Sequence, residues 1–162
     1  MKIAGMASNR GRNLRNIADR APGGAEVSVV VANDADAPVL DAMAKRGVAT
    51  EVVERADGEG REAHEERVLD ALADYDFDIV CLDGYMRVLT EPFLDAAPTT
   101  LNVHPSLLPS FAGNDVHERV LDAGVRQTGC TVHVATEEVD GGPIVTQEAV
   151  PVFEGDDADD LA

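Results

Sequence analysis

Residues 100–109 read TLNVHPSLLP, a short strand that runs out into a loop bounded by prolines. Asn102 and His104 are two positions apart on this predicted strand, so their side chains share a face. Before this stretch, short apolar runs alternate with amphipathic segments, a pattern that predicts a doubly wound α/β fold with a mainly parallel sheet. Ligands of such folds bind at the carboxyl ends of the strands, where this amide and this imidazole project together.

The remaining elements follow from the same alternation. Helices are expected from the 8–14 loop to about residue 20 and at 37–46, 61–74, 91–97 and 116–123, and strands at 2–7, 26–32, 48–53, 78–82, 99–103, 128–135 and 143–152. The last two strands have no helix between them, so we expect an antiparallel addition to a sheet with helices on both faces. No repeat or linker interrupts the pattern, which predicts a single domain over residues 1–162.

Asn102, His104 and Asp140 are the candidate catalytic residues. An imidazole at a strand end donates to a developing oxyanion or takes up a proton near neutral pH, and an amide NH2 adds a second donor. A carboxylate is the usual third partner, because it orients the imidazole and favours its protonated form. Asp140 lies in the turn VDGGP at 139–143 and is the best candidate. Taken alone, each of these residues is more often part of a plain turn than of a catalytic site.

The composition is strongly acidic. The chain carries 31 Asp and Glu against 13 Lys and Arg, a formal net charge of −18 over 162 residues. Such a chain repels nucleic acid and anionic membranes, so neither is an expected partner. The acid excess with only two lysines, Lys2 and Lys45, favours a halophilic source over an ordinary acidic protein of the cytoplasm.

The positions of the cysteines and histidines indicate the redox environment and argue against a metal site. Cys81 and Cys130 lie in apolar strand-like runs, which predicts two buried, separate thiols in a reducing cytoplasm. His64 is expected on the surface, and His117 and His133 in structural positions. No His or Cys cluster has metal-ligand spacing, so we expect no metal, and no apolar run has the length of a membrane span.

The first predicted strand feeds a polar loop, SNRGRN at residues 8–13, which opens a helix. The free N–H groups and the dipole of a helix N-terminus bind anions, so Gly11, Arg12 and Asn13 are candidate phosphate-binding residues. One glycine does not make a phosphate fingerprint, and a plain strand-to-helix loop is the alternative. A complete dinucleotide fingerprint is absent, which argues against a dehydrogenase.

Two motifs together carry a resemblance to a known family. NVHPSLLP at 102–109, followed by VDGGPIV at 139–145, closely resembles the folate-dependent formyltransferases, in particular those that formylate glycinamide ribonucleotide. The resemblance covers nearly the whole chain. It implies formyl transfer from 10-formyltetrahydrofolate, or a related formyl-pterin, to the amine of glycinamide ribonucleotide in purine biosynthesis. Gly11 and Asn13 match the phosphate loop of the family, whereas Arg10 and Arg12 depart from its Gly- and Ser-rich form.

The resemblance also implies where the folate binds, because the stretch from Met86 to Leu89 matches the family's folate-lining segment. Gly84, where the backbone can approach a ligand closely, and Pro105 are assigned to the substrate cleft. The folate-binding residues are then expected in loops at strand ends: Arg61, Met86, Arg87, Val88, Leu89, Thr136, Glu137, Glu138 and Val139.

Three alternatives remain open from the sequence. One is a formyltransferase acting on a tRNA-bound methionine or a sugar nucleotide, although the acidic charge argues against tRNA. The second is a formyltetrahydrofolate hydrolase with water as acceptor, and the third is a non-catalytic scaffold domain of the same fold. Relatives continue with a C-terminal helix where this chain reads FEGDDADDLA at 153–162, so we expect either a truncated chain or a partner that supplies the helix. The oligomeric state is left open.

Overall fold

The structure is a computed structural model that describes residues 1–161. It divides into two compact units, Met1–Leu101 and Asn102–Ala162. The strands form one seven-stranded sheet in the order β3-β2-β1-β4-β5-β6-β7. Strand β5 (Thr100–His104) contains the boundary between the units. The predicted mainly parallel sheet with an antiparallel addition is confirmed.

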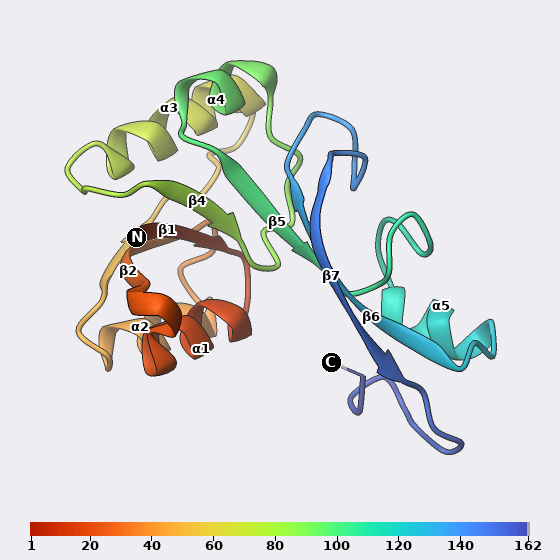
Figure 1. Ribbon diagram of the computed structural model, residues 1–162. Helices are drawn as coiled ribbons and strands as arrows, with labels where there is room; N and C mark the ends of the chain where they lie inside the picture. The colour runs from red at the N-terminus through yellow and green to blue at the C-terminus, as the bar shows by residue number, and fades with distance from the viewer. Residues whose placement is uncertain (162) are drawn as a thin grey trace. The chain divides into compact units, whose positions relative to one another are not determined.

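The first unit is the parallel part of the fold. Figure 1 shows α1 and α2 on one face of its strands and α3 and α4 on the other. Strand β1 lies between β2 and β4, and β2 pairs with β3, all in parallel. The elements of this unit are β1 (Lys2–Ala7), α1 (Arg12–Arg20), the 3-10 turn η1 (Pro22–Gly24), β2 (Glu26–Ala32), α2 (Pro38–Ala44), β3 (Ala49–Val52), α3 (Arg61–Leu72), β4 (Ile79–Leu82) and α4 (Glu91–Ala96).

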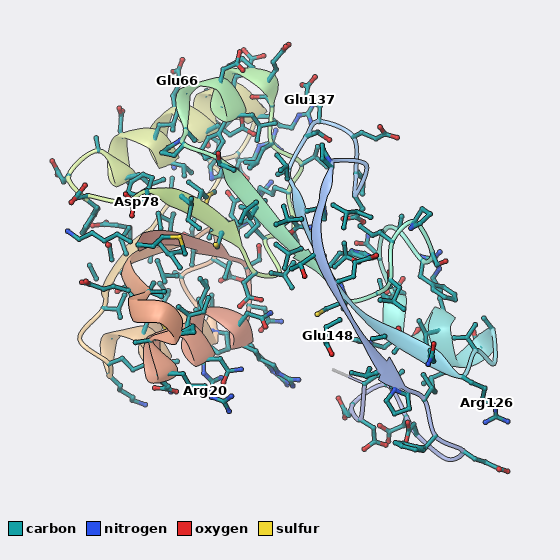
Figure 2. The ribbon with its side chains drawn as sticks, viewed as in Figure 1. Arg20, Glu66, Asp78, Arg126, Glu137 and Glu148 are labelled. Atoms are coloured by element: carbon teal, nitrogen blue, oxygen red, sulfur yellow. The ribbon has the colours of Figure 1, made fainter. Side chains whose placement is uncertain are left out.

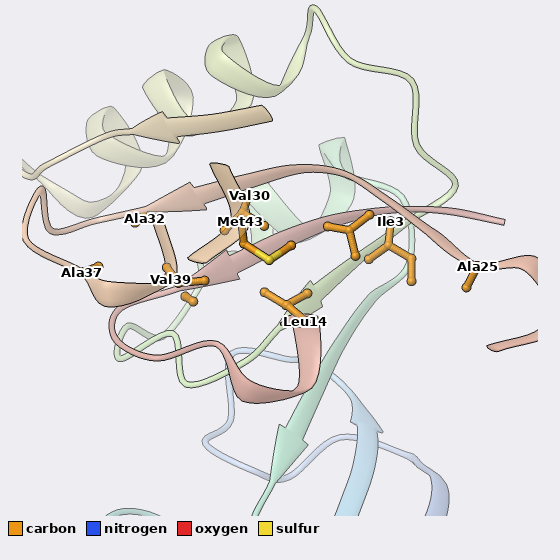
Figure 3. Close-up of a cluster of buried hydrophobic side chains, with 10 residues drawn as sticks. Ile3, Leu14, Ala25, Val30, Ala32, Ala37, Val39 and Met43 are labelled. Carbon is orange, nitrogen blue, oxygen red and sulfur yellow. The ribbon is translucent and has the colours of Figure 1, made fainter. Parts of the chain in front are cut away.

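A hydrophobic core lies beneath α1 and α2. Leu14, Val39 and Met43 pack on Val30 of β2, as Figure 3 shows. A Cβ on Gly5 of β1 would lie 2.6 Å from Leu14 Cδ1, so a larger residue there would force the Leu14 side chain to move. Close packing of β1 against α1 therefore follows directly from the small residue at position 5.

The second unit contains β6 and β7 as an antiparallel pair, with Cys130 opposite Glu148 and His133 opposite Ile144. The register shifts between Val132 and His133, which is a β-bulge or an equivalent irregularity. A small core of Val116, Val120 and Val152 lies under α5. The elements of this unit besides the end of β5 are α5 (Val116–Asp122), β6 (Gln127–Val134) and β7 (Ile144–Pro151).

Two predictions about single side chains are wrong, both because the periodicity of an element decides which face a residue takes. His64 is not on the surface: it is buried on α3 at the same spacing as Val68 and Leu72, and its Nε2 lies 2.7 Å from the carbonyl oxygen of Val53. Cys130 is exposed, because the neighbouring Thr131 occupies the buried face of β6.

The sequence predicted a buried Cys81, and the structure shows it half-buried. Its pKa is raised to about 11, first by burial and then by the charge of Asp83. A thiol with so high a pKa stays protonated at neutral pH and is unreactive. In the part of the chain that the structure describes, no helix has the length and apolar character needed to cross a membrane.

Candidate active site

A buried polar cluster in the second unit brings together three residues that the sequence singled out. It consists of Asn102, His104, His133 and Asp140, and we call it the Asp140 cluster. Asn102 and His104 project from the same face of β5, and both reach the carboxylate of Asp140. The side chain of Asp140 is 9% exposed and that of His104 is 5% exposed, so water screens their interaction weakly.

Backbone geometry holds Asp140 in place. The residue has a φ of 53°, a left-handed conformation that Asp tolerates better than most residues. The turn closes on Gly142, where a Cβ would lie 1.8 Å from the carbonyl oxygen of Val134. The N–H of Val134 in turn donates to the carbonyl of Pro143 at 2.9 Å. The glycine therefore allows the close backbone approach that aims the carboxylate at β5.

Both ring nitrogens of His104 face acceptors. Nδ1 lies 3.2 Å from Asp140 Oδ2, and Nε2 lies 2.9 Å from the carbonyl oxygen of Phe111. A ring with protons on both nitrogens donates to both acceptors at once, whereas a neutral ring donates to one. The carboxylate therefore fixes the ring orientation, and Nε2 presents an N–H to a single oxygen.

The Asp140 carboxylate accepts further hydrogen bonds. Oδ2 accepts from the N–H of Gly113 at 2.8 Å, and Oδ1 accepts from Asn102 Nδ2 at 3.4 Å. His133 Nε2 lies 3.6 Å from the same Oδ1. Gly113 and Phe111 belong to the loop before α5, and their backbone groups cover the cluster from that side. A backbone carbonyl in contact with a candidate catalytic nitrogen cannot be predicted from residue types, because every residue has a carbonyl group.

The loop that follows His104 is held by a second set of hydrogen bonds. Thr131 Oγ1 donates to the carbonyl of Ser106 at 2.6 Å and accepts from the N–H of Leu108 at 3.0 Å. Gln147 Nε2 donates to the carbonyl of Leu108 at 2.9 Å. Pro105 follows His104 directly and is exposed. These hydrogen bonds hold the loop from Pro105 to Pro109 against β6 and β7.

In the first unit, the carboxylate of Asp83 occupies backbone N–H groups at the start of α1, where the sequence predicted a phosphate. The N–H of Asn13 donates to Asp83 Oδ2 at 2.8 Å, and the N–H of Leu14 donates to the same oxygen at 3.0 Å. Asn13 Nδ2 donates to Asp83 Oδ1 at 2.9 Å. The N–H of Asn13 is therefore occupied in this structure, because a carboxylate of the chain already caps α1, and phosphate binding by Gly11, Arg12 and Asn13 stays a prediction.

Gly11 itself is buried with a φ of 54°, and a Cβ there would lie 2.4 Å from Val39 Cγ2. The glycine is thus required by the packing of α1 on α2, whatever the loop binds. Arg10 and Arg12 are exposed on either side of it. Their guanidinium groups leave positive charge at the loop even though Asp83 occupies amides of the first turn.

The polar loop is tied to the loop that follows β4. The N–H of Ser8 donates to the carbonyl of Gly84 at 3.1 Å, and the N–H of Met86 donates to Ser8 Oγ at 2.9 Å. Gly84 has a φ of 70°, which an L side chain rarely adopts. Together with the bonds of Asp83, these contacts make the two loops one rigid substructure of the first unit.

Beside this substructure, the first unit contains a cavity of about 230 Å³. Three of its lining residues are arginines, Arg55, Arg61 and Arg87. The remaining lining residues are His64, Glu65, Tyr85, Met86 and Val88.

Two polar groups near this cavity have no hydrogen-bond partner among the described residues: the hydroxyl of Tyr85 and Nε of Arg87. The pKa of Tyr85 is raised to about 12, first by burial, while the charge of Arg87 lowers it and that of Glu65 raises it. The carboxylate of Glu65 accepts from the N–H and the hydroxyl of Thr90. The cavity is therefore positively charged and carries unsatisfied polar atoms, as a site for an anionic ligand does.

The structure brings some of the predicted folate-binding residues together and separates others. Arg61, Met86, Arg87 and Val88 line the cavity, whereas Leu89 is 3% exposed and belongs to the buried core. In the second unit, Thr136 Oγ1 donates to the carbonyl of Glu138 at 3.2 Å, and Val139 is exposed just before Asp140. Glu137 and Glu138 are exposed in the same loop.

No group of three or more His, Cys, Asp or Glu side chains in the described part of the chain has an arrangement suited to a metal ion. The sequence did not predict that three side chains take part in these two regions: His133, Asp83 and Tyr85. His133 and Thr131 stand at alternate positions of a strand, which predicts a shared face with the site. Asp83 directly follows a strand end, where ligand-contacting residues gather.

The fold and this cluster define a transferase of the formyltransferase type. The sequence matches the family model described as formyl transferase over residues 1–162, and the chain belongs to that family.

Within this family, the chain is similar to proteins that are named for glycinamide ribonucleotide formylation or purine biosynthesis. The chain is 37% identical to the phosphoribosylglycinamide formyltransferase of Escherichia coli (strain K12), over 99% of this chain and 78% of that protein. It is 43% identical to the trifunctional purine biosynthetic protein adenosine-3 of Bos taurus, over 99% of this chain. The crystal structure of glycinamide ribonucleotide transformylase 1 from Symbiobacterium toebii superposes with a TM-score of 0.92 at 41% identity, covering 99% of this chain and 78% of that one.

The chain spans 16% of the length of the Bos taurus relative. It therefore corresponds to one part of that trifunctional protein and to most of the bacterial proteins.

Proposed function

We propose that this chain transfers a formyl group from 10-formyltetrahydrofolate, or a related formyl-pterin, to the amine of glycinamide ribonucleotide in cytoplasmic purine biosynthesis. The observation that carries the proposal is the Asp140 cluster, in which one buried carboxylate holds the imidazole of His104 and the amide of Asn102. The choice of acceptor follows the names of the E. coli and S. toebii relatives.

The proposed chemistry is attack of the acceptor amine on the formyl carbon. The C=O pair moves onto oxygen, and the resulting oxyanion accepts hydrogen bonds from His104 Nε2–H and Asn102 Nδ2–H. The C=O bond then re-forms, the bond to the folate nitrogen breaks, and one proton passes from the amine to that nitrogen. Asp140 holds the His104 ring in the orientation in which Nε2–H points at the oxyanion.

The contact between His104 and Phe111 adds a requirement to this scheme. Nε2–H donates to the Phe111 carbonyl at 2.9 Å, so the formyl oxygen must replace that carbonyl as acceptor. Phe111 has a φ of 58°, a conformation that costs energy for a bulky residue. A shift of this loop on substrate binding would relieve that conformation and uncover the donor.

For the folate we propose the cavity lined by Arg61, Met86, Arg87 and Val88 in the first unit. Folate contacts by Thr136, Glu137, Glu138 and Val139 are proposed from the resemblance alone. A reduced folate ends in carboxylates, and arginine binds carboxylates in a two-pronged geometry. Arg55 also lines the cavity and adds to its positive charge. The unpartnered Arg87 Nε supports a ligand that supplies an acceptor.

For the acceptor phosphate we propose the loop of Gly11, Arg12 and Asn13, with Gly84 and Pro105 lining the path of the substrate. The charges of Arg10 and Arg12 support an anion here. Asp83 opposes it, since its carboxylate holds two N–H groups of the first turn of α1. The phosphate therefore has to draw on the arginine side chains or displace Asp83.

The proposal is tested by supplying the purified chain with 10-formyltetrahydrofolate and glycinamide ribonucleotide, other amines, or no acceptor. We expect formylated glycinamide ribonucleotide, with His104→Ala as the inactive control. Release of formate at the same rate with and without any amine would instead identify a hydrolase. Absence of both products from a folded chain that binds folate would contradict the proposal.

We also propose that the protein is adapted to high salt. The excess of acidic residues is a surface property, since the buried exceptions in the described part of the chain are Glu65 and Asp140. Glu66 and Glu148, labelled in Figure 2, are examples of exposed acidic residues. Salt screens repulsion among such charges, so the melting temperature should rise between low and molar KCl. A melting temperature independent of KCl would contradict adaptation to salt.

A further inference from the structure

His133 is a buried histidine of β6 that the chemistry above does not use. It is 2% exposed and lies at the register shift between Val132 and His133. Such irregularities next to active sites re-aim a side chain. Here the ring is aimed at the Asp140 cluster: Nε2 lies 3.0 Å from Asn102 Nδ2 and 3.6 Å from Asp140 Oδ1.

The surroundings of the ring determine which nitrogen carries the proton. Nδ1 lies 3.0 Å from the carbonyl oxygen of Val134, which can only accept, so Nδ1 must donate. In a neutral ring Nε2 is then an acceptor. The atom opposite it at 3.0 Å is the amide nitrogen of Asn102, which can only donate. The neutral Nδ1–H form of His133 therefore satisfies both contacts.

The opposite orientation of the Asn102 amide fails on the same distances. It would place the amide oxygen of Asn102 about where Nδ2 lies, at 3.4 Å from Asp140 Oδ1. Two acceptor oxygens would then face each other in a buried site. One arrangement matches every donor to an acceptor: Nδ1–H of His133 to Val134, one proton of Asn102 Nδ2 to His133, and the other proton toward Asp140.

We propose that His133 is a positioning residue for formyl transfer: its Nε2 accepts one amide proton of Asn102 and so directs the second toward the oxyanion. This inference rests on the proposed function for its catalytic consequence, although the hydrogen-bond arrangement stands by itself. The second proton now makes the longer contact, 3.4 Å to Asp140 Oδ1, and is the one available to the substrate oxygen. Asn102 acts on the substrate, and His133 acts through Asn102.

Two nearly isosteric substitutions separate positioning from packing. In His133→Gln the side-chain oxygen reaches about the position of Nε2 and accepts from Asn102, whereas His133→Asn extends only to about Nδ1. We expect His133→Asn to lower kcat about tenfold or more, a part of the ~100-fold cost of losing an oxyanion donor, with KM for both substrates changed less than twofold. His133→Gln should recover most of the loss. Equal losses in both variants, or a loss confined to KM, would overturn the proposal.

A measurement independent of activity tests the hydrogen-bond arrangement in the wild-type chain. The ¹⁵N shifts of the histidine rings identify the protonated nitrogen, and the His133 signals are assigned by their loss in His133→Gln. We expect the neutral Nδ1–H form near neutral pH. A ring protonated on Nε2 would overturn the proposal even if the chain is active. If the Nδ1–H form is found in a chain that formylates no amine, the proposed function fails and the orientation of Asn102 by His133 stands.

Discussion

The buried polar groups of the Asp140 cluster are matched donor to acceptor, whereas those around the arginine-lined cavity are not. Asp140 accepts from Asn102, His104 and Gly113, and both nitrogens of His133 have partners. At the cavity, the Tyr85 hydroxyl and Arg87 Nε have none among the described residues.

This difference in hydrogen bonding indicates a catalytic role for the Asp140 cluster and a ligand-binding role for the cavity. A group that stabilises charge during a reaction must be oriented before the substrate arrives, so partners in the free protein hold it in place. A group that binds a ligand gains most when the ligand supplies the missing partner, so it is left unsatisfied in the free protein. Substitutions in the first region should therefore change rate, and those in the second affinity.

The largest effect is expected for Asp140→Asn. The amide keeps the size of the carboxylate but removes the charged acceptor that orients His104, so kcat should fall about 100- to 1,000-fold. Folate affinity, measured by titration with a non-reactive analogue, should change less than threefold. A variant with near-wild-type kcat would show that the carboxylate has no part in the chemistry.

Smaller effects, on affinity, are expected at the cavity. Arg61→Gln and Arg87→Gln should each weaken folate binding about ten- to a hundredfold, since a charge-assisted hydrogen bond contributes about 1.5–3 kcal/mol. Arg126→Gln is the matched control, because Figure 2 shows this arginine at the surface of the second unit, and it lines no part of the cavity. If all three variants bind the folate analogue equally well, the ligand of the cavity is something else.

Asp83→Asn should increase the affinity of the chain for the acceptor substrate. Removing the charge next to the N–H groups of Asn13 and Leu14 should tighten the binding of glycinamide ribonucleotide, and of inorganic phosphate, by roughly fivefold at low salt. Asp41→Asn, an exposed carboxylate on α2, controls for the change in net charge. Unchanged affinity in both variants would place the phosphate away from α1.

The smallest effect is on stability. A buried hydroxyl without a partner costs about 1–3 kcal/mol, so Tyr85→Phe should raise the free energy of unfolding or leave it unchanged. Urea denaturation measures this difference, and the m-value should be the same in both proteins. A clear loss of stability would mean that the hydroxyl has a partner, such as a bound water, and that this part of the comparison is mistaken.

Sequence patterns predicted the fold closely because its elements are short and regular. The strands at 2–7 and 26–32 have the predicted bounds, and helix ends differ by about two residues, as at α3, which ends at Leu72. Asn102 and His104 were placed on one face by the two-residue period of a strand, and the structure brings both to Asp140. Local periodicity was sufficient for these features.

What could not be predicted depends on contacts between distant residues. Asp83 is 70 positions from Asn13, and no local pattern indicates that its carboxylate would cap α1. The orientation of His133 depends on an irregularity in the pairing of β6 with β7, and the acceptor of His104 Nε2 is a backbone carbonyl. Burial of His64 was visible in its spacing from Val68, but the surrounding charged residues of α3 favoured a solvated face.

A double-mutant cycle on single-turnover formyl transfer tests most directly whether Asp140 acts through His104. Rates are measured for the wild type, His104→Ala, Asp140→Asn and the double variant, with saturating 10-formyltetrahydrofolate and glycinamide ribonucleotide. If the cluster acts as a unit, each single substitution removes most of the rate and the double variant is little slower than the slower single one. Independent, multiplying losses would contradict the account, because Asp140 would then contribute without His104.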